Sequence, residues 1–286
     1  MRVLVIGSNG QLGTDLVEAL DQRHAVGVLG LDLPEIDITD PQSVELVFGG
    51  FDPDVVVNCA AWTAVDAAEE REEAALLVNG VGPRIIAEEC RKAGAWLVHV
   101  STDYVFDGHA TVPYAEDDPP DPASAYGRTK LAGETAVREV LSDAHYIVRT
   151  AWLYGRHGEN FVKTMLRLER ERDTVSVVDD QRGQPTYSRD LADQIVRLVE
   201  GRPAVGTYHG TNSGEVTWFG LTQEIFRLAG ADPGRVLPTD STAFVRPAPR
   251  PSYSVLGHAR WAETGIPEMR DWREALAAAF ADGIAP

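Results

Sequence analysis

Residues 1–13, MRVLVIGSNGQLG, decide the fold of this chain. The apolar run Val3–Ile6 predicts a β-strand. Glycines follow it at the spacing Gly-x-x-Gly-x-x-Gly, and a helical pattern then runs from Gln11 to Leu20. Glycines at this point allow a tight turn and let the backbone approach a pyrophosphate, which then lies against free N–H groups at the helix start. Ordinary turns also use glycine, but the position between a strand and a helix favours a dinucleotide site. We expect its contacts to come from Gly7, Asn9, Gly10, Gln11, Leu12 and Gly13.

The first half of the chain continues this alternation of short apolar runs and helical patterns. Such an alternation implies right-handed βαβ crossovers and a parallel sheet covered by helices on both faces. We therefore predict an α/β fold with a Rossmann-type doubly wound parallel sheet, formed by an NAD(P)-binding domain over residues 1–150. Its further strands are expected at Ala25–Leu31, Val55–Asn58, Trp96–Val100 and Tyr146–Arg149, and its further helices at Pro41–Phe48, Glu72–Ala93 and Ser124–Leu141.

After about Thr150 the alternation loosens and stretches rich in Pro and Gly appear. We expect residues 151–286 to form mainly a smaller C-terminal α/β substrate-binding domain, with residues 172–205 returning to the first domain. Helical patterns in this half cover Asn160–Glu171, Ser188–Glu200, Thr217–Ala229 and Asp271–Phe280.

Composition excludes several classes of function. The formal net charge of −18 repels phosphate backbones, so we expect no nucleic-acid partner. No apolar run reaches the roughly 20 residues of a membrane span, and the first residues lead straight into a strand, so we expect a cytoplasmic protein without a membrane partner. Cys59 and Cys90 form no Cys-x-x-Cys pair, which leaves little support for a metal site and predicts reduced thiols.

Residues after the second and third predicted strands are further candidates for cofactor contacts. Asp32 lies where an acidic residue commonly binds the adenosine ribose, which favours NADH, although a simple loop aspartate is the competing interpretation. NADPH stays open as the alternative cofactor. Asp37 and Ile38 are candidates to flank the adenine. Small side chains after the third strand, at Ala60 and Ala61, would let the cofactor lie close, and Trp62 and Thr63 follow in the same loop as further candidates.

Tyr126 and Lys130 form a Tyr-x-x-x-Lys pair at the start of a predicted helix. Four residues apart, they share one helix face, and a nearby ammonium would lower the pKa of the phenol. The tyrosine could then protonate a carbonyl oxygen as hydride reaches the carbon. Such pairs are often mere surface neighbours. However, the chain has only three lysines, Lys92, Lys130 and Lys163, and a lysine kept at this spacing suggests a task that arginine cannot perform.

The fourth predicted strand ends in hydroxyl side chains. The carboxyl ends of parallel strands face the ligand crevice, so a hydroxyl there could bind both a substrate carbonyl and the tyrosine. Thr102 is our choice and Ser101 the alternative. Strand-end hydroxyls usually serve as caps or turn residues, and only the conjunction with Tyr126 and Lys130 favours catalysis.

Together these residues resemble the extended short-chain dehydrogenase/reductase superfamily and, within it, the dTDP-4-dehydrorhamnose reductases. The resemblance spans essentially the whole chain. Besides the glycine loop, it is carried by NCAAWTAV (58–65), STDYVFDG (101–108), YGRTKLAGE (126–134), RTAWLYG (149–155), NFVKTMLRL (160–168), VDDQRGQPT (178–186) and Arg250-Pro251-x-x-Ser254.

The resemblance implies that NADPH or NADH reduces the C4 keto group of dTDP-4-dehydro-6-deoxy-L-mannose to give dTDP-L-rhamnose. Thr102, Tyr126 and Lys130 would be catalytic. Asp103 and Trp152 match positions that contact the sugar, although core packing is a nearly equal interpretation of Trp152. The resemblance further suggests Asn160, Gln184 and Arg250 on the nucleotide side.

Several alternatives stay open. The substrate could be another dTDP-4-ketosugar of an antibiotic sugar pathway, or the chain could be an epimerase or dehydratase that keeps its NAD. A non-catalytic regulatory homologue is also conceivable, but Tyr126 and Lys130 are intact. The expected partner is a small dTDP-sugar, and a homodimer is compatible with the sequence.

Overall fold

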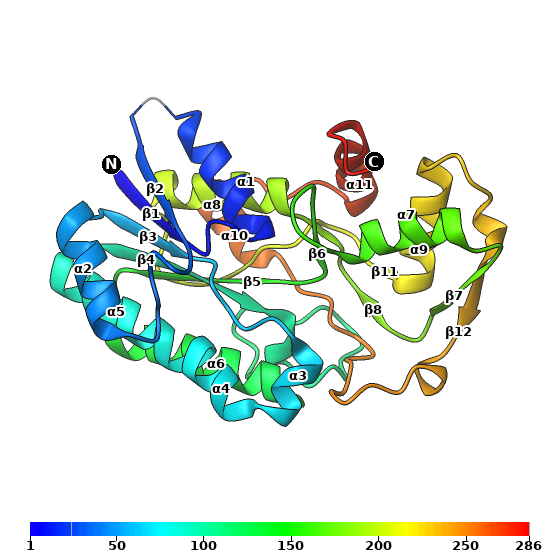
Figure 1. Cartoon of the computed structure of the whole chain (residues 1–286), viewed down its shortest axis with the longest axis horizontal. Coiled ribbons are helices and arrows are strands. Elements are labelled where there is room, and N and C mark those ends of the chain that lie inside the picture. Colours follow the sequence, from blue (N-terminus) through cyan, green and yellow to red (C-terminus); the bar gives the residue numbers. More distant parts are fainter. Residues whose placement is uncertain (24, 286) are drawn as a thin grey trace.

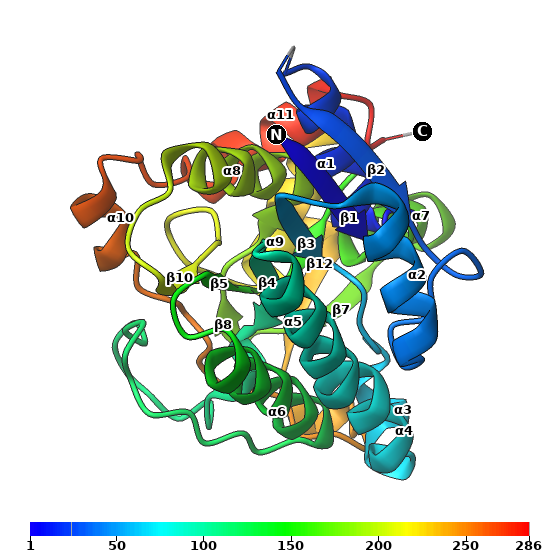
Figure 2. The same ribbon diagram turned by 90° about the vertical axis from the view of Figure 1, so that its left-hand side faces the viewer.

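The computed structural model describes residues 1–23 and 25–285, so Pro286, at the end of the expected second domain, lies outside the described residues. Its largest sheet has six strands, all parallel to their neighbours, in the order β10-β5-β4-β3-β1-β2 (Figure 1, and Figure 2 for β10). This confirms the predicted doubly wound parallel sheet. The strands are β1 (Arg2–Ile6), β2 (Gly27–Leu31), β3 (Val55–Asn58), β4 (Trp96–Thr102), β5 (His145–Thr150) and β10 (Gly206–His209).

Helices cover both faces of this sheet. The helices α1 (Gln11–Asp21) and α8 (Ser188–Gly201) lie on one face, whereas α2 (Pro41–Phe51), α5 (Gly82–Ala93) and α6 (Ala125–Val140) lie on the other (Figure 2). Successive residues of a strand point to opposite faces. Val3 and Val5 of β1 therefore pack towards α1 and α8, and Leu4 and Ile6 towards α2 and α5. Burying apolar side chains on both faces, at about 1.5–3 kcal/mol each, explains why these strands show no polar alternation.

The strand order reverses beside β1, because β2 pairs with one of its edges and β3 with the other. In open parallel sheets a crevice forms outside the carboxyl ends of the strands at such a reversal. The glycine loop follows β1 at this point, and the ends of β3 and β4 lie beside it. The topology therefore places the predicted cofactor and catalytic segments at one edge of the sheet.

The helix predicted over Glu72–Ala93 is divided into three parts. The helix α4 (Glu72–Leu76) leads into the π-helical turn η1 (Leu77–Val81) and then into α5. A further helix, α3 (Val65–Glu70), precedes them and was missed by the sequence analysis. Its six residues are too few to show a full amphipathic period.

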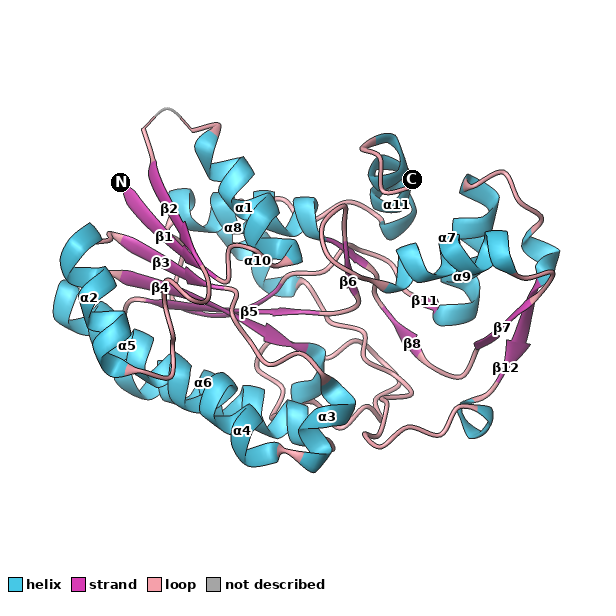
Figure 3. Cartoon of the chain, in the orientation of Figure 1, coloured by secondary structure: helices cyan, strands magenta, loops and turns pink. Residues whose placement is uncertain are grey.

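The C-terminal part builds a second hydrophobic core from helices and short strands (Figure 3). The helices α7 (Phe161–Glu171), α9 (Trp218–Leu228) and α11 (Trp272–Ala281) agree with the predicted patterns. Three two-stranded ladders join them: β6 (Leu153–Tyr154) with β9 (Thr186–Tyr187), β7 (Val175–Val178) with β12 (Val236–Thr239), and β8 (Arg182–Gly183) with β11 (Val216–Thr217). The remaining elements are α10 (Ala259–Thr264) and the 3-10 turns η2 (Asp103–Val105), η3 (Pro233–Arg235) and η4 (Ser241–Ala243).

The chain returns from this second part to the main sheet. The helix α8 packs beside α1, and β10 pairs with β5 as an edge strand, whereas β7 belongs to the second part. The described residues form no helix that is long and apolar enough to cross a membrane.

Candidate active site

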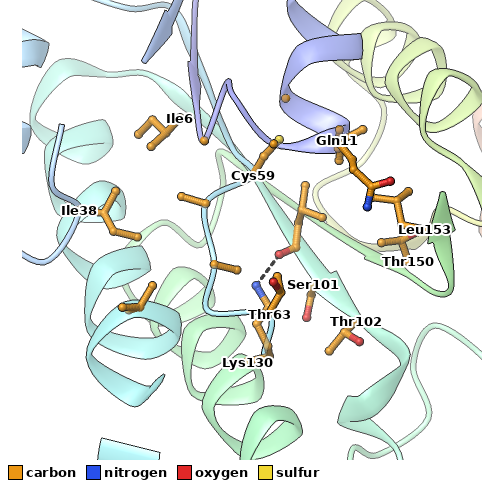
Figure 4. Close-up of a pocket in the computed structure, with 18 of the residues that line it drawn as sticks. Ile6, Gln11, Ile38, Cys59, Thr63, Ser101, Thr102, Lys130, Thr150 and Leu153 are labelled. Atoms are coloured by element: carbon orange, nitrogen blue, oxygen red, sulfur yellow. Dashed lines mark hydrogen bonds between the residues drawn. The ribbon is translucent and has the colours of Figure 1, made fainter. Parts of the chain in front are cut away.

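A cavity of about 680 Å³ opens at the carboxyl edge of the main sheet, between the glycine loop and the ends of β3, β4 and β5 (Figure 4). Both the predicted cofactor segments and the predicted catalytic residues contribute to its walls. The residues proposed from the sequence that line it are Gly7, Gly10, Gln11, Leu12, Gly13, Asp32, Asp37, Ile38, Ala60, Ala61, Thr63, Thr102, Asp103, Tyr126, Lys130 and Trp152.

The glycine loop leaves no room for side chains at two of its positions. Gly7 has φ +80°, and a Cβ there would lie 2.7 Å from the Ala60 nitrogen. A Cβ on Gly13 would lie 2.1 Å from the Gly7 oxygen. Gly10 is the N-cap residue of α1, and no side chain in the described part of the protein caps the helix there. The first N–H groups of α1 are therefore open to an anion, as a pyrophosphate site requires.

Asp32 faces the cavity while it holds the loop. Its carboxylate accepts hydrogen bonds from the backbone N–H of Asn9 at 3.1 Å and of Leu33 at 2.8 Å. Asn9 itself is exposed and does not line the cavity. Asp37 accepts hydrogen bonds from the N–H and hydroxyl of Thr39. Asp32 and Asp37 thus order the two turns on the expected adenosine side.

The catalytic candidates meet where α6 begins against the end of β4. Ser124 caps α6, and Glu69 of α3 accepts the Ala125 N–H at 2.8 Å, which positions Tyr126 in the first turn. The Thr102 hydroxyl donates to Asp103 Oδ1 at 3.0 Å, accepts the Tyr104 N–H at 3.2 Å and lies close to the Tyr126 phenol. Ser101, the alternative to Thr102, also lines the cavity but lies beside Glu134. The geometry therefore favours Thr102.

Burial raises the pKa of Tyr126 to about 12, against the opposing influence of the nearby Thr102 hydroxyl and with a further rise from the charge of Asp103. The expectation that Lys130 would lower this pKa is wrong for the structure. The Lys130 ammonium instead donates to the Val100 carbonyl oxygen at 2.7 Å (Figure 4). Burial lowers the pKa of Lys130 to about 8, although Glu134 favours its charged form. Tyr126 is therefore protonated at neutral pH. It gives up this proton only to a stronger base that forms during a reaction.

Asp103 is a buried carboxyl at the cavity wall. Burial raises its pKa to about 6, against the nearby hydroxyls of Ser254 and Thr102, which favour the charged form. The carboxylate accepts from Thr102, so its charge state governs the direction in which the Thr102 hydroxyl points. Asp103 can therefore orient the hydroxyl that contacts Tyr126.

A buried ion pair, which sequence reasoning missed, supports the helix of Lys130. Arg149 of β5 donates through Nε at 2.9 Å and Nη2 at 2.8 Å to the two oxygens of Glu134, one turn after Lys130. Burial would raise the pKa of Glu134, but Arg149 and Arg138 lower it to about 2. This pair fastens α6 to β5, and no local pattern in the sequence marks it.

Trp62 does not line the cavity, and its contacts instead support residues that do. Its backbone N–H donates to Asn79 Oδ1 at 2.8 Å, and its ring, like that of Tyr126, packs against the cluster of Ala68, Ala75 and Ala125. The Asn79 amide donates to the Trp62 carbonyl at 3.1 Å and to Thr129 at 3.2 Å. Asn79 lies in η1, and π-helical turns are frequent at functional sites. This residue, missed by the sequence analysis, ties the loop after β3 to the catalytic helix.

The residues expected on the nucleotide side are not brought together. Asn160 caps α7 and donates to Gln11 Oε1 at 3.1 Å, beside the cavity. Gln184 is buried, and its Oε1 accepts the Leu256 N–H at 2.8 Å and the Thr211 hydroxyl at 3.0 Å. Arg250 pairs with Asp66 at 2.9 Å. None of the three lines the cavity, and the amide of Gln184 is used within the protein.

The structure adds cavity residues that were not singled out from the sequence. Tyr104 places its ring edge-on to Tyr126, with centroids 5.5 Å apart and planes at 75°. Its position directly after Asp103 was the available signal. The other additional lining residues are Ile6, Leu33, Ile36, Thr39, Cys59, Val65, Val78, Val100, Thr150, Ala151 and Leu153.

A separate cluster joins α1 to the C-terminal part. His157 Nε2 lies 3.7 Å from Asp15 Oδ1 and 3.6 Å from Glu18 Oε1, and Ser188 donates to Asp15. Potential ligand atoms of Asp15, Glu18 and His157 all lie within 4.8 Å of one another, although the sequence analysis expected no metal site. The contact with Ser188 shows that these side chains link α1 to the start of α8.

Comparison with known proteins places this cavity in a family. The family described as RmlD substrate binding domain matches residues 1–284. A dTDP-4-dehydrorhamnose reductase of Streptomyces griseus is 53% identical over 98% of this chain and 93% of its own length. A probable dTDP-4,6-dihydroxy-2-methyloxan-3-one 4-ketoreductase of Streptomyces antibioticus is 52% identical over 100% of this chain and 96% of its own.

The fold agrees with a solved structure. A dTDP-4-dehydrorhamnose reductase of Bacillus anthracis, crystallised in complex with NADP, superimposes with a TM-score of 0.95 at 40% identity, covering 98% of this chain and 99% of the other. The resemblance drawn from the motifs is thus confirmed by sequence and by structure. The chain belongs to the RmlD substrate binding domain family, together with the dTDP-4-dehydrorhamnose reductases that it matches along nearly its whole length.

Proposed function

We propose that this protein reduces the C4 keto group of a dTDP-4-keto-6-deoxysugar with NAD(P)H. The proposed substrate is dTDP-4-dehydro-6-deoxy-L-mannose, and the product is dTDP-L-rhamnose. One observation carries the proposal: the Tyr126 phenol and the Thr102 hydroxyl meet in the cavity that the glycine loop also lines. A proton donor and a dinucleotide-binding turn in one cavity suit carbonyl reduction.

The residues present fit a dinucleotide. Side chains at Gly7 and Gly13 would collide with backbone, and the uncapped start of α1 offers N–H groups to a pyrophosphate. Asp32 lies at the end of β2, where its carboxylate suits a free ribose hydroxyl better than a phosphate. When bound, the reduced nicotinamide supplies the hydride that the carbonyl carbon accepts. Use of NADH is therefore expected alongside NADPH.

The chain's own residues supply the proton and determine when it is transferred. Tyr126 gives its phenolic proton to the C4 oxygen as charge develops there, since its raised pKa keeps that proton in place until a stronger base forms. The Thr102 hydroxyl, whose hydrogen is donated to Asp103, presents a lone pair to the Tyr126 phenol and so positions that side chain beside the bound carbonyl oxygen. The buried Lys130 ammonium donates one hydrogen bond to the Val100 carbonyl oxygen. Its remaining N–H groups can donate to ribose hydroxyls.

The substrate side is proposed from position. Trp152 and Asp103 line the cavity and would contact the sugar ring. Asn160, through its bond to Gln11, and Arg250, which pairs with Asp66, would reach the nucleotide. Gln184 would act only by holding the backbone of Leu256. Against a net charge of −18, a local arginine suits an anionic diphosphate.

We also propose the division into domains, the location in the cell and the assembly. Residues 1–150, joined by α8 and β10, would form the cofactor half, and most of residues 151–286 the substrate half. We propose a cytoplasmic location, where reduced nicotinamide and nucleotide sugars are both available, and a homodimer as the assembly to test by light scattering.

A second candidate substrate is a different dTDP-4-ketosugar, because the relative from Streptomyces antibioticus, at 52% identity, is named as a 4-ketoreductase with another sugar. The test incubates the purified protein with dTDP-4-keto-6-deoxyglucose and each reduced cofactor, with and without a 3,5-epimerase. Cofactor oxidation that requires the epimerase supports the rhamnose substrate, and oxidation without it supports the second candidate. Binding of cofactor without any oxidation would favour the non-catalytic homologue, and turnover of sugar without net oxidation an epimerase.

A further inference from the structure

Trp152, at the cavity wall, has an unusual backbone conformation. Its φ is +44°, in the left-handed region that residues other than glycine rarely adopt. It lies between β5 and β6, directly before Leu153. Such conformations persist only where the surrounding structure holds them, and they concentrate at functional sites. The contacts that hold Trp152 are therefore informative about the sugar side of the cavity.

One face of the Trp152 indole is covered by a second indole. The rings of Trp152 and Trp218 stack with centroids 3.5 Å apart and planes at 10°. Phe161 packs in turn on Trp218, with centroids 4.4 Å apart and planes at 49°. Trp218 does not line the cavity. Trp152 is thus the front ring of an aromatic stack that extends from the cavity into the second core.

The position of Trp218 is fixed by the start of its helix. Trp218 is the first residue of α9, whose cap is Thr217. The Thr217 hydroxyl accepts the Gly220 N–H at 3.1 Å and donates to Asp179 at 2.6 Å. These bonds anchor the helix end. The indole behind Trp152 therefore rests on a rigid element and not on a mobile loop.

Gly183 confines the same indole from another side. A Cβ at Gly183 would lie 2.6 Å from Trp152 Cε2, 2.7 Å from Cζ2 and 2.9 Å from Nε1. Gly183 pairs with Val216 in the ladder of β8 and β11, so one short ladder carries both Gly183 and the segment that leads to Trp218. The ladder and the stack together leave Trp152 little freedom to turn.

We propose that Trp218 is a positioning residue for the sugar: it holds the plane of Trp152 so that the exposed part of that indole packs on the apolar C–H surface of a deoxyhexose ring. This inference rests on the proposed function. Aromatic rings contribute to binding through large contact area and defined geometry, and that contribution is lost when the ring can rotate away. Trp218 then acts through Trp152, without touching the substrate.

The central test is a double-mutant cycle with W152L, W218L and W152L/W218L, measured as KM and kcat for the dTDP-4-ketosugar. W218L should raise KM about ten-fold, equal to about 1.4 kcal/mol, while kcat and the KM of the cofactor change by less than about two-fold. In the W152L background, adding W218L should change little, because a residue that acts through another has no separate effect. The matched variant W218F, which keeps a ring for stacking, should recover most of the affinity.

Two outcomes would overturn the proposal: an unchanged KM in W218L, or an equal further rise in KM when W218L is added to W152L. Melting curves and near-ultraviolet circular dichroism verify that the variants fold and that the indole coupling is lost. If the wild type reduces no dTDP-4-ketosugar, the proposed function fails. The same cycle measured by direct binding of dTDP-L-rhamnose still decides the role of Trp218.

Discussion

Replacing Tyr126 with phenylalanine removes one oxygen atom from the cavity and leaves the ring in place. The ring keeps its edge-on contact with Tyr104 and its packing in the cluster with Trp62. The hydroxyl hydrogen of Thr102 is directed to Asp103, so this neighbour cannot serve as a substitute proton donor. Of the ~10²- to 10⁴-fold that a positioned acid supplies, we therefore expect a loss of about 10³-fold, equal to about 4 kcal/mol.

The assay follows the absorbance of the reduced nicotinamide in single turnovers, and cofactor affinity is measured separately by fluorescence titration. Cofactor affinity should be nearly unchanged, because the phenol is expected to act on the substrate oxygen. Tyr146→Phe is the matched control: its phenol donates to the Pro203 carbonyl in the core, away from the cavity. If Tyr126→Phe retained a rate within about five-fold of the wild type, with hydride transfer still limiting, the proton would have to come from another group.

Three further predictions concern Lys130, Asp103 and the glycine loop. Lys130→Met should weaken cofactor binding and slow turnover, whereas Lys92→Met, which removes an exposed amine paired with Glu89, should change neither; equal kinetics for both variants would remove Lys130 from the site. The pH profile of kcat/KM should fall below about pH 6, as Asp103 gains a proton and loses the charge that orients the Thr102 hydroxyl, and above about pH 8, as Lys130 loses its charge. Asp103→Asn should abolish the acidic limb alone, and a profile that keeps this limb would contradict the assignment. Gly13→Ala should weaken dinucleotide binding at least about ten-fold, because its methyl carbon would lie 2.1 Å from the Gly7 oxygen; Gly27→Ala, with no heavy atom within 4 Å, is the control, and similar affinities for the two would argue against a tightly fitted loop.

The sequence by itself determined the features that depend on local patterns. Apolar runs bounded by turns predicted β1, β3, β4 and β5 to within a few residues, and the glycine spacing placed the dinucleotide loop at the start of α1. The pair Tyr126 and Lys130, four residues apart, predicted a shared helix face. These features follow from the periods of strands and helices and from the steric freedom of glycine, which neighbouring residues alone decide.

Only the tertiary structure decided what those side chains contact. Burial and the direction of the Lys130 ammonium towards Val100 reversed the expected shift of the tyrosine pKa. The amide of Gln184 was expected at the nucleotide but serves Leu256 and Thr211. The stack of Trp152 on Trp218 joins residues that are 66 positions apart in the sequence. Desolvation and packing depend on elements distant in the chain, and two-residue ladders such as β8 with β11 are too short to leave a periodic signal.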